Sequence, residues 1–118
     1  MVPSDCLFCK VVAGEVPSDE VWSTGGTYAF RDIEPVAPVH VLIVPRRHID
    51  HAGTLGDDPA DAAVLAEMFA AARDIARQEG VDGTGYRLVC NVGEDAANSV
   101  GHLHLHLLGG RRLGWPPG

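Results

Sequence analysis

The feature that most constrains this sequence is a run of alternating histidines and leucines near its end, SVGHLHLHLLGGRR, residues 99–112. Successive side chains of a β-strand point to opposite faces, so a strand here separates the two residue types. The histidines are His102, His104 and His106, and the leucines are Leu103, Leu105 and Leu107. Leucines at this period suit burial, whereas three neighbouring imidazoles gain little from it and repel one another when charged. The run therefore favours a chemical site over a solvated edge strand.

Composition sets the class of protein. The chain has 118 residues, enough for one packed domain over residues 1–118, with 46% hydrophobic and 21% charged residues. It shows no bilayer-spanning apolar run and no basic, apolar leader, so we expect a cytoplasmic protein without a membrane partner. The formal net charge of −7 disfavours a nucleic-acid polymer as partner, because such binding needs a basic patch.

The three cysteines indicate different environments. An odd count in a chain without secretory features argues against a disulfide framework. Cys90 ends the apolar run YRLVC, and we expect it to be a small buried core residue. Cys6 and Cys9 form C-L-F-C, which on one helical turn aims both sulfurs the same way. This pair is suited to holding a metal.

Local signals predict an α+β fold. A short helix is expected over SDCLFCKVVAG, capped by Ser4 or Asp5 and ended by Gly14. A long helix is expected over residues 58–80, with Asp58 as its cap. Its apolar positions, expected in the core, are Leu65, Met68, Phe69, Ala72, Ile75 and Ala76. Strands are expected over TYAFRDI, PVHVLIVP, YRLVCNV and the histidine run. These elements predict an antiparallel sheet covered on one side by the long helix.

Two mechanisms suit alternate histidines on a strand. They can bind a catalytic Zn²⁺ that keeps one position for water, or a neutral imidazole can itself be the nucleophile. A hydrolytic zinc site usually needs a general base, and the run itself contains no acid. Small and hydrogen-bonding residues surround it instead: Asn91, Asn98, Ser99, Gly109 and Gly110. Neighbours of this kind suit a phosphate group and favour the nucleophile.

The run H-L-H-L-H-L-L resembles the signature of the histidine triad (HIT) family. Three longer segments extend the resemblance over nearly the whole chain: DCLFCKVVAGEVPS, AFRDIEPVAPVHVLIVPRRHI and NVGEDAANSVGHLHLHLLGGRRLGWPPG. The tail is similar to that of the histidine triad nucleotide-binding proteins, the purine nucleoside phosphoramidase branch. The resemblance implies a HIT-like fold with a short N-terminal helix, a homodimer, and a hydrolase without an organic cofactor.

The same resemblance implies roles for individual residues. His104 would attack the α-phosphorus of a purine nucleoside 5′-phosphoramidate and form a nucleotidyl-histidine intermediate, which water then hydrolyses. His106 would hold a phosphoryl oxygen, Asn91 and Ser99 would donate to the phosphate or the leaving group, and His40 would back the site. Two alternatives remain open: a dinucleoside polyphosphate hydrolase with the same nucleophile, and a nucleotide-binding adaptor with vestigial activity.

The family resemblance also implies a pocket for the nucleoside. The resemblance implies that Asp32 takes the ribose hydroxyls. It gives the walls around the base as Leu7, Phe8, Val11, Phe30 and Ile33. From the sequence alone, plain core is the favoured interpretation for each of these apolar residues.

Bacterial-type members of the family carry a structural zinc, which the resemblance places on Cys6, Cys9, His48 and His102. Two sulfurs and two nitrogens make a closed tetrahedral set suited to Zn²⁺. His51 is an alternative to His48, and two free thiols are the alternative to a metal site.

Two departures from the family pattern affect the substrate side. Ala96, Ala97 and Asn98 stand where relatives commonly have glycines and a glutamine, and alanine takes positive φ less readily than glycine does. We therefore expect the loop to run differently. Gly101 stands where relatives often carry an aromatic residue, which bears on substrate preference.

Overall fold

A five-stranded antiparallel sheet forms the centre of the molecule, with strand order β1-β2-β3-β5-β4. The computed structural model describes residues 5–118. The strands are β1 (Glu20–Ser23), β2 (Thr27–Arg31), β3 (Val39–Pro45), β4 (Tyr86–Val89) and β5 (Leu105–Gly109). The helices are α1 (Leu7–Val12) and α2 (Pro59–Gln78), with short 3₁₀ turns at Ala52–Thr54 and Glu94–Ala96. This confirms the predicted α+β class.

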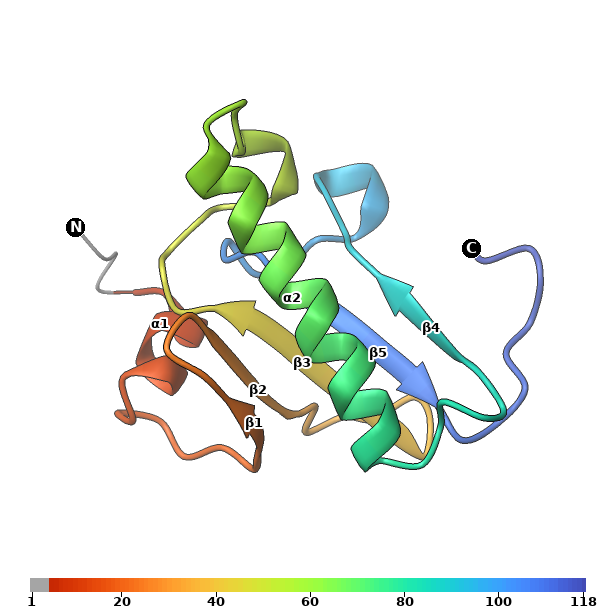
Figure 1. Ribbon diagram of the computed structural model, residues 1–118. Helices are drawn as coiled ribbons and strands as arrows, with labels where there is room; N and C mark the ends of the chain where they lie inside the picture. The colour runs from red at the N-terminus through yellow and green to blue at the C-terminus, as the bar shows by residue number, and fades with distance from the viewer. Residues whose placement is uncertain (1–4) are drawn as a thin grey trace.

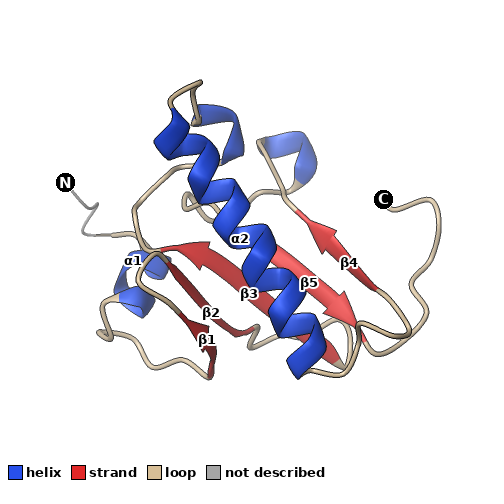
Figure 2. Ribbon diagram, in the orientation of Figure 1, coloured by secondary structure: helices blue, strands red, loops and turns tan. Residues whose placement is uncertain are grey.

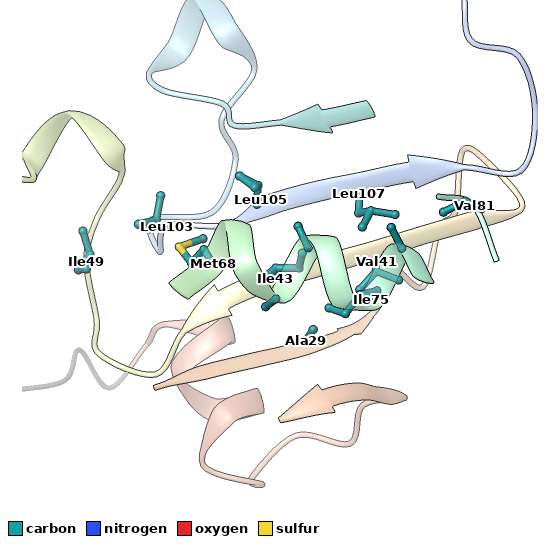
Figure 3. Close-up of a cluster of buried hydrophobic side chains, with 13 residues drawn as sticks. Ala29, Val41, Ile43, Ile49, Met68, Ile75, Val81, Leu103, Leu105 and Leu107 are labelled. Atoms are coloured by element: carbon teal, nitrogen blue, oxygen red, sulfur yellow. The ribbon is translucent and has the colours of Figure 1, made fainter. Parts of the chain in front are cut away.

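Helix α2 lies across one face of the sheet (Figures 1 and 2). Beneath it, alternate residues of the central strands form the main core, in which Val41, Ile43 and Leu107 are fully buried. Figure 3 shows these side chains gathered between α2 and strands β3 and β5. Leu103 and Leu105 belong to the same cluster, so the leucines of the alternating run face the core as predicted.

The sequence of α2 accounts for its bounds and its packing. Asp58 caps it by accepting a hydrogen bond from the backbone N–H of Ala60, and Pro59 occupies its first position. Gly80, at φ +73°, follows its end. Met68 and Ile75 are fully buried, but the prediction for Phe69 is wrong, because its ring is 53% exposed. One residue corresponds to about 100° of helix rotation, which turns Phe69 off the stripe that contains Met68.

Helix α1 lies on the opposite face of the sheet and packs Phe8 and Val11 against Phe30 and Leu42. Its predicted cap is wrong: Cys6 is the N-cap and its sulfur accepts the Cys9 N–H at 3.4 Å. Asp5 therefore lies one residue too early, and Ser4 lies outside the described residues. The predicted end is confirmed, since Gly14 follows α1 at φ +79°.

Three strand predictions need correction. The sequence analysis missed β1, a four-residue edge strand whose two end residues are exposed. Strand β5 begins only at Leu105, so His102 and His104 lie in the extended segment before it. Strand β4 ends at Val89, which leaves Cys90 exposed rather than in the core. None of the helices described in residues 5–118 combines the length and apolarity needed to cross a membrane.

Candidate active site and metal cluster

Three of the six histidines meet on the face of the sheet opposite α2. His40 lies on β3, His106 on β5, and His104 two residues before His106. Strand pairing places His106 opposite Leu42. The ring centroid of His106 is 5.2 Å from that of His40 and 5.1 Å from that of His104. The Phe8 ring of α1 contacts His104 edge-on at 5.2 Å.

Hydrogen bonding fixes which nitrogen of His104 is free. Its Nδ1 lies 2.8 Å from the backbone carbonyl oxygen of His102. A carbonyl can only accept, so Nδ1 carries the proton and Nε2 of the neutral ring keeps its lone pair. His104 is a buried residue whose neutral ring has an unprotonated Nε2, as a nucleophile requires.

Two hydrogen bonds that meet at His40 determine the tautomer of His106. Nδ1 of His40 accepts the backbone N–H of Val36 at 3.2 Å, which leaves the proton of neutral His40 on Nε2. That Nε2–H donates to Nδ1 of His106 at 3.0 Å. The proton of neutral His106 is therefore on Nε2, where it can donate to a ligand.

Burial keeps this pair neutral. Desolvation, together with the neighbouring His104 and His40, lowers the pKa of His106 to about 4. Desolvation also lowers the pKa of His40, although the Asp32 carboxylate, 3.4 Å from its Nε2, partly offsets this. At neutral pH the pair therefore acts as hydrogen-bond donors without positive charge.

An apolar pocket of about 240 Å³ lies between α1 and strands β2 and β3. All six residues predicted for the nucleoside line it: Leu7, Phe8, Val11, Phe30, Asp32 and Ile33. Phe8, Val11 and Phe30 are buried, whereas Ile33 is 94% exposed and Leu7 is also exposed. The two exposed residues are therefore not core, and they stand at the rim of the pocket.

Four side chains form a cluster that can hold a metal ion: Cys6, Cys9, His48 and His102. Nδ1 of His102 lies 3.4 Å from both sulfurs, and Nδ1 of His48 lies 3.2 Å from Sγ of Cys9. The far nitrogen of each histidine donates elsewhere, to the Pro45 carbonyl at 2.9 Å and to the Asp50 carboxylate at 2.9 Å.

These outer hydrogen bonds leave the lone pairs of both histidines directed at the sulfurs, the arrangement found around bound zinc. His51 is not part of the cluster, because its Nδ1 accepts the Gly53 N–H. The donor set therefore fits a structural Zn²⁺.

A second group, Asp32, His40 and His106, also brings three possible ligand atoms together. Its hydrogen bonding argues against a metal there. Nδ1 of His40 already accepts an N–H, so Nε2 carries a proton and has no lone pair to offer. This group is better described as a hydrogen-bond relay.

The predicted phosphate donors are arranged differently from one another. Ser99 lines a cavity of about 490 Å³ together with Leu7 and His48. Asn91 instead donates its side-chain N–H to the Ala96 carbonyl at 2.8 Å, and this bond stabilises the loop between β4 and β5. The structure therefore brings His40, His104 and His106 together and gives Asn91 a supporting contact within the chain.

Comparisons with known proteins agree with this arrangement. Residues 13–113 match the family model described as HIT domain. The chain belongs to the HIT domain family. A 14 kDa zinc-binding protein of Brassica juncea is 39% identical over 114 residues, covering 97% of this chain and 100% of the relative.

Solved structures show the same fold. A HIT family hydrolase from Legionella pneumophila is 46% identical, with a TM-score of 0.93, covering 97% of this chain and 100% of that one. A histidine triad nucleotide-binding protein from Candida albicans is 31% identical, with a TM-score of 0.80, covering 97% and 85%. This HIT domain thus has hydrolases and a nucleotide-binding protein among its structural neighbours.

The loop before the histidines of this HIT domain contains an unusual backbone conformation. Ala97 lies in the left-handed region, at φ 59° and ψ 34°. Its N–H donates to the Glu94 carbonyl at 2.9 Å. The loop therefore takes a conformation that favours glycine, without having one at that position. Ala97 thus has a positive φ, although alanine takes it less readily than glycine does.

Proposed function

We propose that this protein is a nucleotidyl hydrolase that cleaves purine nucleoside 5′-phosphoramidates through an intermediate on His104. The observation that carries the proposal is the 2.8 Å contact between Nδ1 of His104 and the His102 carbonyl. In the neutral ring this contact leaves Nε2 unprotonated, and the ring lies against His106 and against Phe8 of the apolar pocket. An unprotonated imidazole is a good nucleophile for phosphorus and also a good leaving group.

The first step makes a P–N bond and breaks another. Nε2 of His104 attacks the α-phosphorus, the bond from phosphorus to the amine breaks, and its electron pair leaves on the amine nitrogen, which takes a proton from water. Nε2–H of His106 donates to a phosphoryl oxygen as charge builds there. Water then attacks the same phosphorus, releases a nucleoside monophosphate and returns the electron pair to His104.

The base and ribose would occupy the apolar pocket. Its walls are two phenylalanines and aliphatic side chains, which suit the faces of a purine. The Asp32 carboxylate stands at the edge of this pocket, where it can accept from ribose hydroxyls. Its Oδ1 also accepts the Glu34 N–H at 2.8 Å, which holds the carboxylate in place.

The cavity beside Ser99 favours an amine over a polyphosphate as leaving group. Among the described residues that line it are Asp5 and Asp50, which supply carboxylates, and none of those described is a lysine or arginine. A polyphosphate placed there would meet like charge, whereas a neutral or cationic amine would not. This supports a phosphoramidase over a dinucleoside polyphosphate hydrolase.

The metal cluster has no catalytic part in this scheme. Cys6, Cys9, His48 and His102 would hold Zn²⁺ as a closed four-ligand set, which supplies structure and keeps no position for a reacting water. Bound in this way, the ion would tie the start of α1 to the segments around His48 and His102.

Rapid-quench mass spectrometry with adenosine 5′-phosphoramidate tests the proposal. Wild-type protein should carry an adenylyl adduct on the peptide that contains His104, and His104→Ala should carry none. A His106→Gln variant, in which hydrolysis is slowed, should accumulate more of the adduct. Turnover without any adduct would replace the nucleophile with direct attack by water. Side-by-side kinetics with a diadenosine polyphosphate should show slower turnover than the phosphoramidate.

A further inference from the structure

One residue joins the metal cluster to the candidate nucleophile. The side chain of His102 is fully buried, and its Nδ1 faces both cysteine sulfurs at 3.4 Å. The backbone carbonyl of the same residue accepts the Nδ1–H of His104. The residue that faces the cysteines therefore also carries the carbonyl that orients His104.

The peptide unit between His102 and Leu103 is held at both ends. Its carbonyl accepts from His104, and its N–H donates to the Ile49 carbonyl at 2.6 Å. Ile49 directly follows His48, the second histidine of the cluster. Two of the four cluster residues thus adjoin the hydrogen bonds that fix this one peptide plane.

The third link is α1. Cys6 caps this helix with its sulfur, and Phe8, two residues later, contacts the rings of both His102 and His104, with centroids 6.1 and 5.2 Å away. A metal that draws the cysteines and histidines together would therefore also fix the aromatic side chain that packs against His104.

From these contacts we propose that the Cys₂His₂ cluster positions the His104 imidazole through the His102 backbone, so that metal affinity and nucleotide affinity are coupled. Cys6, Cys9 and His48 are then positioning residues for His104, because they act on it through His102 and α1. The coupling rests on the proposed function only in its use of the nucleotide site. Thermodynamic linkage requires the effect to be reciprocal.

The decisive measurement is the Zn²⁺ affinity of the protein, obtained by competition with a chromophoric chelator, without AMP and with saturating AMP. AMP should raise the Zn²⁺ affinity by about 5-fold or more, and Zn²⁺ should raise the AMP affinity by the same factor. Equal Zn²⁺ affinities in the two conditions, with AMP binding both forms, would overturn the coupling and leave the proposed function intact.

A holoprotein variant covers the case in which removing the metal unfolds the chain. Asp50→Ala removes the acceptor that holds Nε2 of His48 while keeping all four cluster residues, and Asp50 is exposed. Asp50 also lines the cavity beside Ser99, where loss of its negative charge would by itself favour a phosphate. The coupling predicts the opposite sign: the zinc-loaded variant should bind AMP several-fold more weakly than wild type. Asp57→Ala, at an exposed aspartate in the following loop, is the matched control and should bind as wild type does. Unchanged AMP binding in Asp50→Ala would contradict the proposal.

A spectroscopic readout separates the coupling from the proposed function. The ¹⁵N signals of His104 report whether Nδ1 or Nε2 carries the proton. In zinc-loaded protein Nδ1 should be protonated, and in zinc-depleted or Asp50→Ala protein the two tautomers should mix. This holds even if AMP fails to bind, an outcome that would reject the proposed function alone. An unchanged Nδ1–H signal in a folded, depleted protein would reject the coupling.

Discussion

Nε2 of His40 lies 3.0 Å from Nδ1 of His106, although the two residues are 66 positions apart in the chain. The backbone N–H of Val36 holds the other nitrogen of His40, so this one contact decides which nitrogen of His106 carries a proton. The proton position of His106 on β5 is thus set by the backbone amide of Val36, which precedes β3.

The neutrality of His106 predicts a pH dependence of stability. Burial and the neighbouring His104 and His40 lower its pKa to about 4, against about 6.5 in the unfolded chain. Between about pH 6.5 and pH 4 the unfolded chain therefore binds a proton on His106 that the native state does not bind. Because of this difference, the free energy of unfolding falls as the pH falls toward about 4. The loss attributable to His106 approaches about 3 kcal/mol at its full extent.

Chemical denaturation between pH 4 and 7.5, with zinc present throughout, checks this expectation. His106→Gln should show a shallower decline than wild type. Because His40, His104 and Asp32 face the same group, His40→Gln provides the comparison that reports their share. Identical pH profiles for wild type and His106→Gln would show that His106 titrates alike in both states.

The left-handed backbone of Ala97 predicts a stabilising substitution. An L-residue in this region costs about 1–2 kcal/mol, and glycine removes that cost while losing more chain entropy on folding. Ala97→Gly should raise the free energy of unfolding by up to about 1 kcal/mol, measured by urea denaturation. Ala96→Gly, in the adjacent 3₁₀ turn, is the control and should be neutral or destabilising. A destabilised Ala97→Gly would contradict the conformation described.

Metal content distinguishes the cluster from free thiols. Purified protein should contain about one zinc per chain by elemental analysis, and Cys9→Ser or His48→Asn should lose most of it. His51→Asn should retain the metal, because His51 lies outside the cluster and caps a 3₁₀ turn instead. Retention of full zinc by His48→Asn would show that another residue completes the site.

The contribution of an Asp32–ribose contact can be measured by comparing AMP with a nucleotide that lacks the ribose hydroxyls. Asp32→Asn should weaken AMP binding by about 10-fold, because a charged acceptor for the ribose hydroxyls is lost. For 2′,3′-dideoxy-AMP, which has no such hydroxyls, the substitution should have little effect on the measured Kd. Equal losses for both nucleotides would mean that Asp32 acts through His40, which lies 3.4 Å from its Oδ2.

The cavity beside Ser99 predicts the effect of filling it. A Cβ at Gly101 would meet no atom within 4 Å, and Gly101 lines the cavity, so a side chain can leave the backbone there without a clash at its first carbon. Gly101→Phe should leave the melting temperature unchanged and slow the turnover of phosphoramidates with bulky amines more than of those with small amines. Gly101→Ala is the control for the loss of glycine. Equal slowing for all amines would show that the cavity does not contribute to substrate selection.

The alternating run was predictable because one physical requirement fixes it. Leu103, Leu105 and Leu107 can be buried together only if the histidines between them face away, and the structure confirms this despite a strand that begins at Leu105. The residues at which α2 begins and ends were predictable because their effect is local. Asp58 and Gly80 act within one turn of the residues that they affect.

Other features depend on contacts that no local pattern contains. The free nitrogen of His102 is decided by the Pro45 carbonyl, 57 residues away, and that of His106 by Val36 through His40. Cys90 was mispredicted because an apolar run does not show where a strand ends. The cap of α1 was missed because sulfur is a rare cap, and Cys6 serves here as both cap and cluster member.

The division of the sheet into two faces has a consequence for how this scaffold can change. Residues that pack under α2 and residues that surround the histidines alternate along the same strands, so neighbours in sequence belong to separate tasks. Substitutions around the pocket and the Ser99 cavity can alter which molecules are accepted without repacking the core beneath α2. The fold therefore suits directed evolution, with a library confined to the histidine-bearing face and the helix-covered face left untouched.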